Sequence, residues 1–352
     1  MKIFTLLLGY LLLALILPGC GRPLLINAPL DTIEASLDRT TPQLMEKHDV
    51  VGLSVAVIRN GKLALSRTYG FGDLESKTAL NERSIFKAAS LGKPIFAYIV
   101  AGLAQQGKID LDELLMTYDV PPAIKHDPRS QLITARMVLT HTTGLPNLGK
   151  PSKALAFQFT PGEDFLYSGH AFQYLQKAIE LITSKSLNQL AEEQVFLPLE
   201  MTRSSYSWKP EYQVHLSHSY DNEKKAFSVK QEASTGHAAW SLYTTVSDYR
   251  KFILHMINEA ETPNSIASQL ITAQTDVAKG VKWGLGWGIQ DTHPNRSIWH
   301  WGSMAGFRHY VVAYPKEKTA VIVMSNSQKA FKIIEDVMGE AIGGNFPSYN
   351  WF

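Results

Sequence analysis

The chain has 352 residues, of which 45% are hydrophobic and 19% charged, and its formal net charge is +2. Such a composition is that of a globular protein with a large buried core. Basic residues occur singly or in short pairs such as Lys224-Lys225, so nucleic acid is not an expected partner. A single cysteine excludes an internal disulfide and a cluster of thiolate ligands.

The amino terminus predicts an exported protein. An almost wholly apolar run from Ile3 to Leu17 follows one basic residue and is ended by Pro18-Gly19. This run is too short for a typical membrane span and fits the apolar core of an export signal. We therefore expect residues 1–20 to form a signal peptide.

The end of this segment, Leu17 to Cys20, resembles the lipobox of bacterial lipoproteins. The resemblance implies that Cys20 carries a lipid that tethers the exported protein to the cell envelope, on its periplasmic side. Gly21 replaces the Asp that retains lipoproteins in the inner membrane, which implies the outer membrane in a Gram-negative cell. An uncleaved anchor and a chance cysteine after an ordinary signal are the alternatives.

The first elements predicted after the signal are a helix and a hairpin. Residues 30–47 have a helical pattern that Pro42 is expected to interrupt. Two β-rich runs, 51–58 and 63–72, flank Asn60-Gly61, a pair that favours a type I′ turn.

Helices are predicted through the middle of the chain. Residues 94–106 are apolar nearly all round, which indicates a buried helix. A second helix is expected at 134–140, with Gly144 and Pro146 as its stop signals. The remaining helices of this region are predicted at 170–184, 187–195 and 246–259.

The last third of the chain returns to strands, predicted at 283–290, 297–302, 307–315 and 319–327 and followed by a helix at 329–342. The predicted fold class is therefore α/β (α+β), with one antiparallel sheet built from both chain ends, flanked by helices, and an inserted helical region. We expect a single domain over residues 24–352. Its α/β lobe spans about 24–95 and 275–352, and its mainly helical lobe spans 96–274.

The stretch KAASLGKPIFAY places Ser90 and Lys93 three residues apart among small and apolar residues. Ser90 stands where a strand-like run ends and a helix begins, at a position that favours an N-cap, and Pro94 fits a first helical turn. Residues three apart on a helix share a face, so we expect the Lys93 amine beside the Ser90 hydroxyl. In a water-poor site at a helix amino end, this amine loses its proton near neutral pH and activates the hydroxyl.

Two other interpretations concern the same stretch. Ser90 could be an N-cap only, with Lys93 extending to the surface. A second Ser-x-x-Lys pair, Ser84 and Lys87, lies in an alternating run whose strand geometry points the two side chains to opposite faces.

Six segments resemble class C β-lactamases and the wider group of penicillin-binding-protein-like serine hydrolases, which includes DD-carboxypeptidases and esterases. In chain order they are SLGKPIFAYIVAGLAQQGKIDLDE, LTHTTGLP, TPGEDFLYSG, LPLEMTRSSY, WGLGWGI and HWGSMAGFRHYVVAYP. The resemblance covers about residues 30–340 and implies the β-lactamase/transpeptidase-like fold.

The resemblance implies an active site of three elements. Ser90 is the nucleophile and Lys93 the proton-shuttling base. Tyr167 exchanges a proton with the nucleophile or leaving group, and a phenol with a pKa of about 10 needs a neighbouring cation, here Lys93, to become a base. His300 occupies the family's Lys or His position, and the backbone amides of Ser90 and Ser303 form the oxyanion hole.

Three further positions are expected at the substrate. Gly302 lets neighbouring backbone approach a bound substrate closely and shares a strand face with His300. Gly169 replaces an Asn that holds the substrate amide in β-lactamases and DD-peptidases. Trp301 replaces a hydroxyl residue that binds the substrate carboxylate. Both departures weaken the case for β-lactam hydrolysis and favour an apolar or esterified acyl group.

The sequence predicts neither a metal nor an organic cofactor. His215 and His218 lack a third ligand at a recognisable spacing. The segment Gly52 to Ala56 resembles a nucleophile elbow but lies inside a predicted strand.

The expected function is that of a serine hydrolase acting through a Ser90 acyl-enzyme on a carboxylic ester or a D-amino-acid-type peptide. A β-lactamase or DD-carboxypeptidase is the alternative within the class. A catalytically silent lipoprotein that binds cell-wall fragments is the alternative outside it. Oligomeric state is not predicted.

Overall fold

The computed structural model describes residues 22–148, 155–228, 233–291 and 295–351. The predicted signal peptide and the lipidation site at Cys20 lie outside these residues. Within the described ranges, no helix is both long and apolar enough to cross a membrane.

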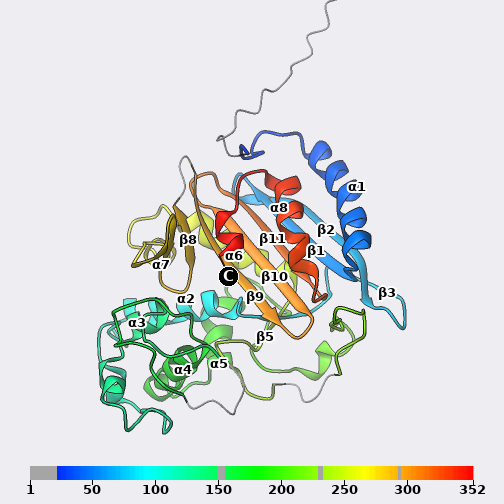
Figure 1. The fold of residues 1–352 in the computed structure, drawn as a ribbon. Helices are drawn as coiled ribbons and strands as arrows, with labels where there is room; N and C mark the ends of the chain where they lie inside the picture. Colours follow the sequence, from blue (N-terminus) through cyan, green and yellow to red (C-terminus); the bar gives the residue numbers. More distant parts are fainter. Residues whose placement is uncertain (1–21, 149–154, 229–232, 292–294, 352) are drawn as a thin grey trace, which may run out of the picture.

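Within the described residues, nine antiparallel strands form one sheet in the order β3-β2-β1-β11-β10-β9-β8-β7-β6 (Figure 1). The strands are β1 Gly52–Arg59, β2 Lys62–Asp73, β3 Thr78–Ala79, β6 Thr275–Ala278, β7 Val281–Trp283, β8 Gly288–Asp291, β9 Arg296–Met304, β10 Phe307–Tyr314 and β11 Thr319–Ser325. At its centre, β1 pairs with β11, with Val55 opposite Val323. The predicted antiparallel sheet built from both chain ends is therefore confirmed.

The hairpin of β1 and β2 turns at Asn60-Gly61, as predicted. Both residues have positive φ, 51° at Asn60 and 67° at Gly61, which is the requirement of a type I′ turn. The amide of Gly61 also donates a hydrogen bond of 2.9 Å to the carbonyl of Lys318, so this turn is tied to the turn between β10 and β11.

Apolar layers cover both faces of the sheet. Helices α1 (Leu30–His48) and α8 (Ile334–Ile342) pack on one face, and α2 (Gly92–Gln105) and α6 (Val246–Glu259) on the other (Figure 1). Alternate residues of β11 serve the two layers, with Ile322 in one and Val323 in the other.

Helix α1 continues through Pro42, so the predicted interruption is wrong. Proline removes one backbone hydrogen bond from a helix. Buried Ile33, Leu37 and Met45 hold α1 against the sheet on both sides of that position, and this packing outweighs the lost bond.

The helical region between the two halves of the sheet contains α3 (Ala135–Leu139), α4 (Gly169–Thr183), α5 (Leu187–Ala191) and α7 (Ile266–Leu270). Figure 1 shows α3, α4 and α5 below the sheet. Two helices differ from the prediction: α5 continues as a π turn, Glu192–Phe196, and a 3₁₀ turn, Ala330–Lys332, precedes α8. Other 3₁₀ turns span Leu115–Thr117, Pro128–Leu132, Pro210–Tyr212 and Pro347–Asn350. The predicted lobe boundaries stay a prediction.

A separate pair of strands, β4 (Phe86–Ala89) and β5 (Leu242–Thr244), joins distant parts of the chain. The sequence pattern did not predict β5, because three residues are too few for a periodic signal. This pair brings the segment after Ala89 beside the segment before Leu242, and both segments contribute to the site described below.

The edge of β9 beyond Trp299 is open on the side of β8, because the pairing of β8 with β9 ends at Trp299. Strand β4 approaches this part of β9 closely at Gly302. A Cβ on Gly302 would lie 2.3 Å from the carbonyl oxygen of Ala88. Only glycine permits this approach, which sets the residues after β4 against β9.

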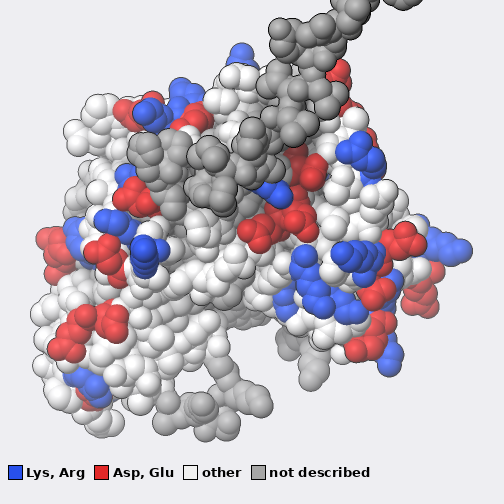
Figure 2. Space-filling model, turned by 45° about the horizontal axis from the view of Figure 1, so that its top comes forward, with Lys and Arg blue, Asp and Glu red and all other residues white. Residues whose placement is uncertain are grey.

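On the face shown in Figure 2, basic and acidic side chains lie close to one another, without an extended surface of either sign. This face therefore offers no broad basic area to the phosphates of a nucleic acid.

We predict that Gly302→Ala lowers the free energy of unfolding by about 1–3 kcal/mol, since a new methyl group must displace the backbone of β4. Urea denaturation measures the change. The control is Gly72→Ala in β2, whose new Cβ meets the flexible end of Leu80 at 3.3 Å. Equal stability of the two variants would contradict this account of Gly302.

Candidate active site

Ser90 lies in the short turn between β4 and α2 and is partly exposed. The residue before it, Ala89, has a φ of 51°, in the left-handed region that costs a non-glycine residue about 1–2 kcal/mol. Helix α2 begins at Gly92 with Leu91 as its N-cap and no side-chain capping bond. The prediction that Ser90 caps the helix is therefore wrong, and its hydroxyl is free for other contacts.

Lys93 is the buried partner of that hydroxyl, with 1% of its surface exposed. Its Nζ donates to Ser90 Oγ at 3.0 Å and to the carbonyl oxygen of Ala239 at 2.8 Å. Burial lowers the pKa of the amine from 10.5 to about 7. The predicted contact is confirmed, and the alternative in which Lys93 extends to the surface is wrong.

Tyr167 lies with its ring centroid 4.8 Å from the Nζ of Lys93. Its phenolic oxygen is buried without a well-formed hydrogen bond among the described residues. Burial raises the pKa of the phenol, and the nearby Ser90 hydroxyl offsets only part of that rise. The expectation that Lys93 lowers this pKa is therefore wrong, and Tyr167 stays protonated beside an amine that is ready to lose its proton.

His300 is fully buried on β9, and burial with the neighbouring Lys93 lowers its pKa to about 3. Its Nδ1 lies 2.8 Å from the carbonyl oxygen of Trp301, and since that oxygen only accepts, Nδ1 carries the proton. Nε2 is therefore a buried acceptor, and it has no partner among the described residues. The ring centroids of His300 and Tyr167 are 6.1 Å apart.

The Trp301 ring stacks on the His300 ring, with centroids 5.2 Å apart, and lies against the Tyr167 ring at 4.7 Å, tilted by 35°. Trp351 contacts both Trp301 and Phe165, with ring centroids 6.2 and 5.6 Å apart. Aromatic rings therefore border the site at Trp301, the position that has a hydroxyl residue in the family pattern.

Gly169 is buried at the first position of α4, under residues of another loop. Its amide donates to Asn147 Oδ1 at 2.9 Å, and a Cβ on Gly169 would lie 2.6 Å from Cγ of Leu148. The side chains of Asn147 and Leu148 thus take the space that a larger residue at 169 would need.

Ser303 and Gly302 lie on the open edge of β9, with Ser303 exposed and Gly302 buried against β4. The structure therefore places Ser90, Lys93, Tyr167 and His300 together. It also places β9, which carries Ser303, against β4 just before Ser90. Ser84 and Lys87 lie upstream in and beside β4, and the hydroxyl of Ser84 accepts from the amide of Asn81 at 2.9 Å.

His141, which the sequence pattern does not predict as a site residue, is fully buried behind Tyr167, with ring centroids 4.3 Å apart. Its Nδ1 accepts a hydrogen bond of 3.0 Å from the amide of Ser168, the N-cap of α4. Burial holds its pKa well below the ordinary value, so the ring is neutral. A lone histidine in HTTGLP belongs to no spaced motif from which its contact with Tyr167 and the Ser168 amide could be predicted.

The Ala239 carbonyl is not predicted either, because a backbone oxygen has no signature in the sequence. It accepts from both members of the pair, from Lys93 at 2.8 Å and from Ser90 Oγ at 3.4 Å. Among the described residues, no group of three His, Cys, Asp or Glu side chains is placed to hold a metal ion.

The fold and the buried Ser-x-x-Lys pair define the class of β-lactamase-fold serine hydrolases. The family model described as Beta-lactamase matches residues 37–337. The chain therefore belongs to the Beta-lactamase family.

Two curated relatives are similar to this chain at low sequence identity. Protein flp of Staphylococcus aureus strain N315 is 20% identical over 327 residues, which cover 86% of this chain and 65% of that protein. The chain thus spans less than two thirds of the length of that relative. A Beta-lactamase of Pseudomonas fluorescens is 25% identical over 342 residues, covering 84% of this chain and 93% of that protein.

A solved structure shows the same fold. The crystal structure of D-alanine carboxypeptidase AmpC from Burkholderia cenocepacia matches with a TM-score of 0.76 and 16% identity, covering 88% of this chain and 99% of that one.

We predict that Lys93→Met stabilises the protein near neutral pH, because a side chain of similar length fills the same space without a charge to desolvate. Between about pH 7 and 10.5 the unfolded chain binds a proton that the folded chain lacks. Wild-type stability therefore rises over this range, by up to about 1.4 kcal/mol per pH unit. The advantage of the variant should be largest at and below about pH 7 and shrink toward pH 10.

Denaturant unfolding of both proteins at several pH values measures this difference. Lys87→Met, which removes a partly exposed lysine from β4, is the control for loss of a charge. An advantage of Lys93→Met that stays constant with pH would contradict the assignment of a neutral buried amine.

Proposed function

We propose that the protein hydrolyses a carboxylic ester or a D-amino-acid-type peptide through an acyl-enzyme on Ser90. The observation that carries the proposal is the contact of 3.0 Å between the Ser90 hydroxyl and a buried lysine whose pKa is about 7. A serine hydroxyl needs an adjacent base, and a neutral amine at this distance supplies one.

In the first step, the Lys93 amine takes the proton of Ser90 while Ser90 Oγ bonds to the substrate carbonyl carbon. The carbonyl π electrons move to oxygen, and the backbone amides of Ser90 and Ser303 stabilise the resulting oxyanion. The oxyanion then reforms the carbonyl and expels the alkoxide or amine, which receives a proton. Water then bonds to the acyl carbonyl carbon while the Lys93 amine takes one of its protons. The resulting oxyanion reforms the carbonyl, the bond to Ser90 Oγ breaks, and Lys93 returns the proton to Ser90 as the carboxylic acid leaves.

Tyr167 acts in this scheme as a proton relay in its phenol form, passing its proton to the leaving group and regaining one from Lys93. The raised pKa of Tyr167 supports a donor in preference to a standing phenolate. His300 acts as a neutral acceptor through Nε2, the buried nitrogen without a partner among the described residues. Buried polar atoms of this kind are expected to find partners when substrate binds.

The substrate proposal favours an ester with an apolar portion. The indole of Trp301 lies against Tyr167, so an apolar ring stands where the family has a hydroxyl residue, while Leu148 and Asn147 together take the space at Gly169. Activity on β-lactams or peptidoglycan peptides is the second candidate, supported by a Beta-lactamase and a D-alanine carboxypeptidase among the similar proteins. A silent protein that binds cell-wall fragments is the third, and the intact Ser90–Lys93 contact argues against it.

We predict that a fluorophosphonate labels the soluble mature protein and that Ser90→Ala abolishes the labelling. The labelling rate of the wild type should rise as pH increases through about 7, since the Lys93 amine is neutral above that value. Gel fluorescence after timed exposure gives the rates. Absence of labelling by both a fluorophosphonate and a fluorescent penicillin would rule out the acyl-enzyme.

The same samples rank the substrates. Faster turnover of p-nitrophenyl esters than of nitrocefin supports the ester, whereas penicillin labelling with slow release supports peptidoglycan peptides. Ser84→Ala is the matched control for Ser90→Ala, because it removes the serine of the other Ser-x-x-Lys pair.

We further propose that the protein is exported and lipid-anchored through Cys20. The support is the apolar run from Ile3 to Leu17 and the lipobox-like Leu17 to Cys20. Cys20→Ser is expected to block processing at this site and to change the membrane fraction of the full-length protein, as measured by immunoblotting of cell fractions. Unchanged processing and fractionation would contradict the lipid anchor.

A further inference from the structure

The carbonyl that contacts the Ser90–Lys93 pair belongs to Ala239, in a segment of irregular backbone that runs into β5. One side of this segment is fixed by Ser241. Its Oγ accepts from the amide of His237 at 2.7 Å and donates to the carbonyl of Tyr206 at 2.6 Å. Ser241 also bridges to Ala89, next to the proposed nucleophile.

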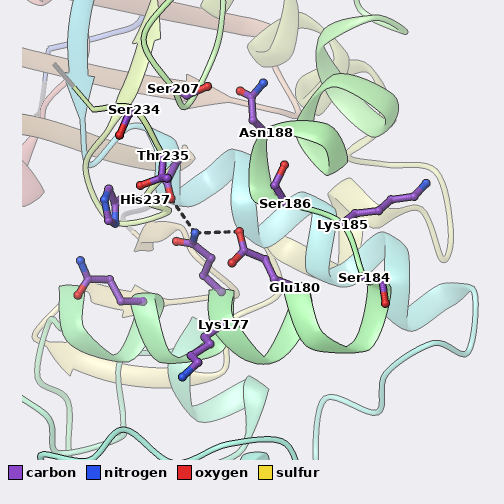
Figure 3. A pocket seen from close by; sticks show the side chains of 13 residues that line it. Lys177, Glu180, Ser184, Lys185, Ser186, Asn188, Ser207, Ser234, Thr235 and His237 are labelled. Atoms are coloured by element: carbon purple, nitrogen blue, oxygen red, sulfur yellow. Dashed lines mark hydrogen bonds between the residues drawn. The ribbon is translucent and has the colours of Figure 1, made fainter.

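The other side of the segment is fixed by one side chain, that of Gln176 on α4. Its Oε1 accepts from the amide of Ala238 at 2.8 Å, and its Nε2 donates to the carbonyl of Gly236 at 2.7 Å. The same Nε2 lies 3.1 Å from Glu180 Oε1 and donates to it. Figure 3 marks these two donated hydrogen bonds with dashed lines, one of them reaching the labelled Glu180.

A cavity of about 910 Å³ lies beside this contact and is lined by α4, the start of α5 and the segment 234–237 (Figure 3). Polar side chains line it, among them Glu180 on α4 and His237 on the facing segment. Ala238 and Ala239 are buried in the core, and the Gln176 amide is the side chain that joins the backbone of residues 236 and 238 to α4 by hydrogen bonds at the border of this hollow.

Helix α4 connects this restraint to the other side of the site. Ser168 caps the helix directly after Tyr167, with its Oγ accepting from the amide of Ala171 at 3.0 Å. Gln176 follows two turns later on the same helix. One rigid element therefore sets both Tyr167 and the Ala239 carbonyl relative to Lys93.

We propose that Gln176 is a positioning residue for the Ser90–Lys93 pair, fixing residues 236–238 to α4 and thereby holding the Ala239 carbonyl against Lys93. The inference rests on the proposed function of that pair as nucleophile and base. Gln176 touches neither Ser90 nor Lys93, and it acts through the backbone that it holds.

Gln176→Ala removes all three hydrogen bonds and should slow fluorophosphonate labelling of Ser90 about 10- to 100-fold, because small misplacements of catalytic groups have effects of that size. Gln173→Ala is the matched control, since Gln173 lies on the same helix and lines the same cavity. It should label near the wild-type rate. Wild-type labelling of Gln176→Ala would overturn the proposal.

Gln176→Glu separates positioning from packing. A protonated carboxyl can donate to Gly236 and accept from Ala238 as the amide does, whereas a carboxylate cannot donate. It would also face the carboxylate of Glu180, with Lys177, Lys185 and His237 as the other titratable groups lining the cavity. The labelling rate of this variant, divided by that of wild type at each pH, should fall as pH rises from about 5 to 8. A ratio that does not change with pH would overturn the role of the Nε2 donor.

A crystal structure of Gln176→Ala tests the inference independently of activity. Displacement of the Ala239 carbonyl from Lys93 Nζ supports it, and a retained contact of 2.8 Å overturns it. If the wild type itself is not labelled, the proposed function fails, and this distance still decides the role of Gln176. Thermal unfolding of each variant shows whether it folds; if Gln176→Ala does not, the pH series on Gln176→Glu decides.

Discussion

The burial of one amine is the constraint on which the rest of the site depends. Lys93 lies in the apolar layer under the sheet, where a full positive charge would be costly, and its pKa falls to about 7 as a result. Its two acceptors, Ser90 Oγ and the Ala239 carbonyl, satisfy the nitrogen while leaving it able to lose a proton. The same burial raises the pKa of Tyr167 and lowers that of His300, so all three groups are neutral together at mildly alkaline pH.

Each group around the amine comes from a different segment of the chain, and a separate local structural feature positions each segment. Ala89, with positive φ, turns the chain from β4 to Ser90. The Ser168 cap, supported by His141, places Tyr167 at the start of α4. The missing side chain at Gly302 lets β4 approach β9, which carries His300. None of these features takes part in the proposed chemistry, but each one positions a group that does.

Features with a repeating pattern could be predicted from the sequence, and single contacts could not. The central strands, the turn at Asn60-Gly61 and the pairing of Ser90 with Lys93 follow from periodicity, turn chemistry and helical spacing. The interruption at Pro42 and the capping by Ser90 were wrong, because tertiary packing and a strained turn override local preference. His141 and the Ala239 carbonyl depend on contacts between distant segments, which one sequence does not encode in any short pattern.

The pairing of β1 with β11 has a consequence for how the molecule forms. Val55 lies opposite Val323, so the centre of the sheet joins residues from near the two ends of the chain. Until β11 has been synthesised, β1 lacks its central neighbour and the sheet is incomplete. Contacts of such long sequence separation fold slowly, since loop closure precedes the energetic gain. A nascent chain of this topology therefore remains incompletely folded until its carboxyl-terminal strands have been synthesised.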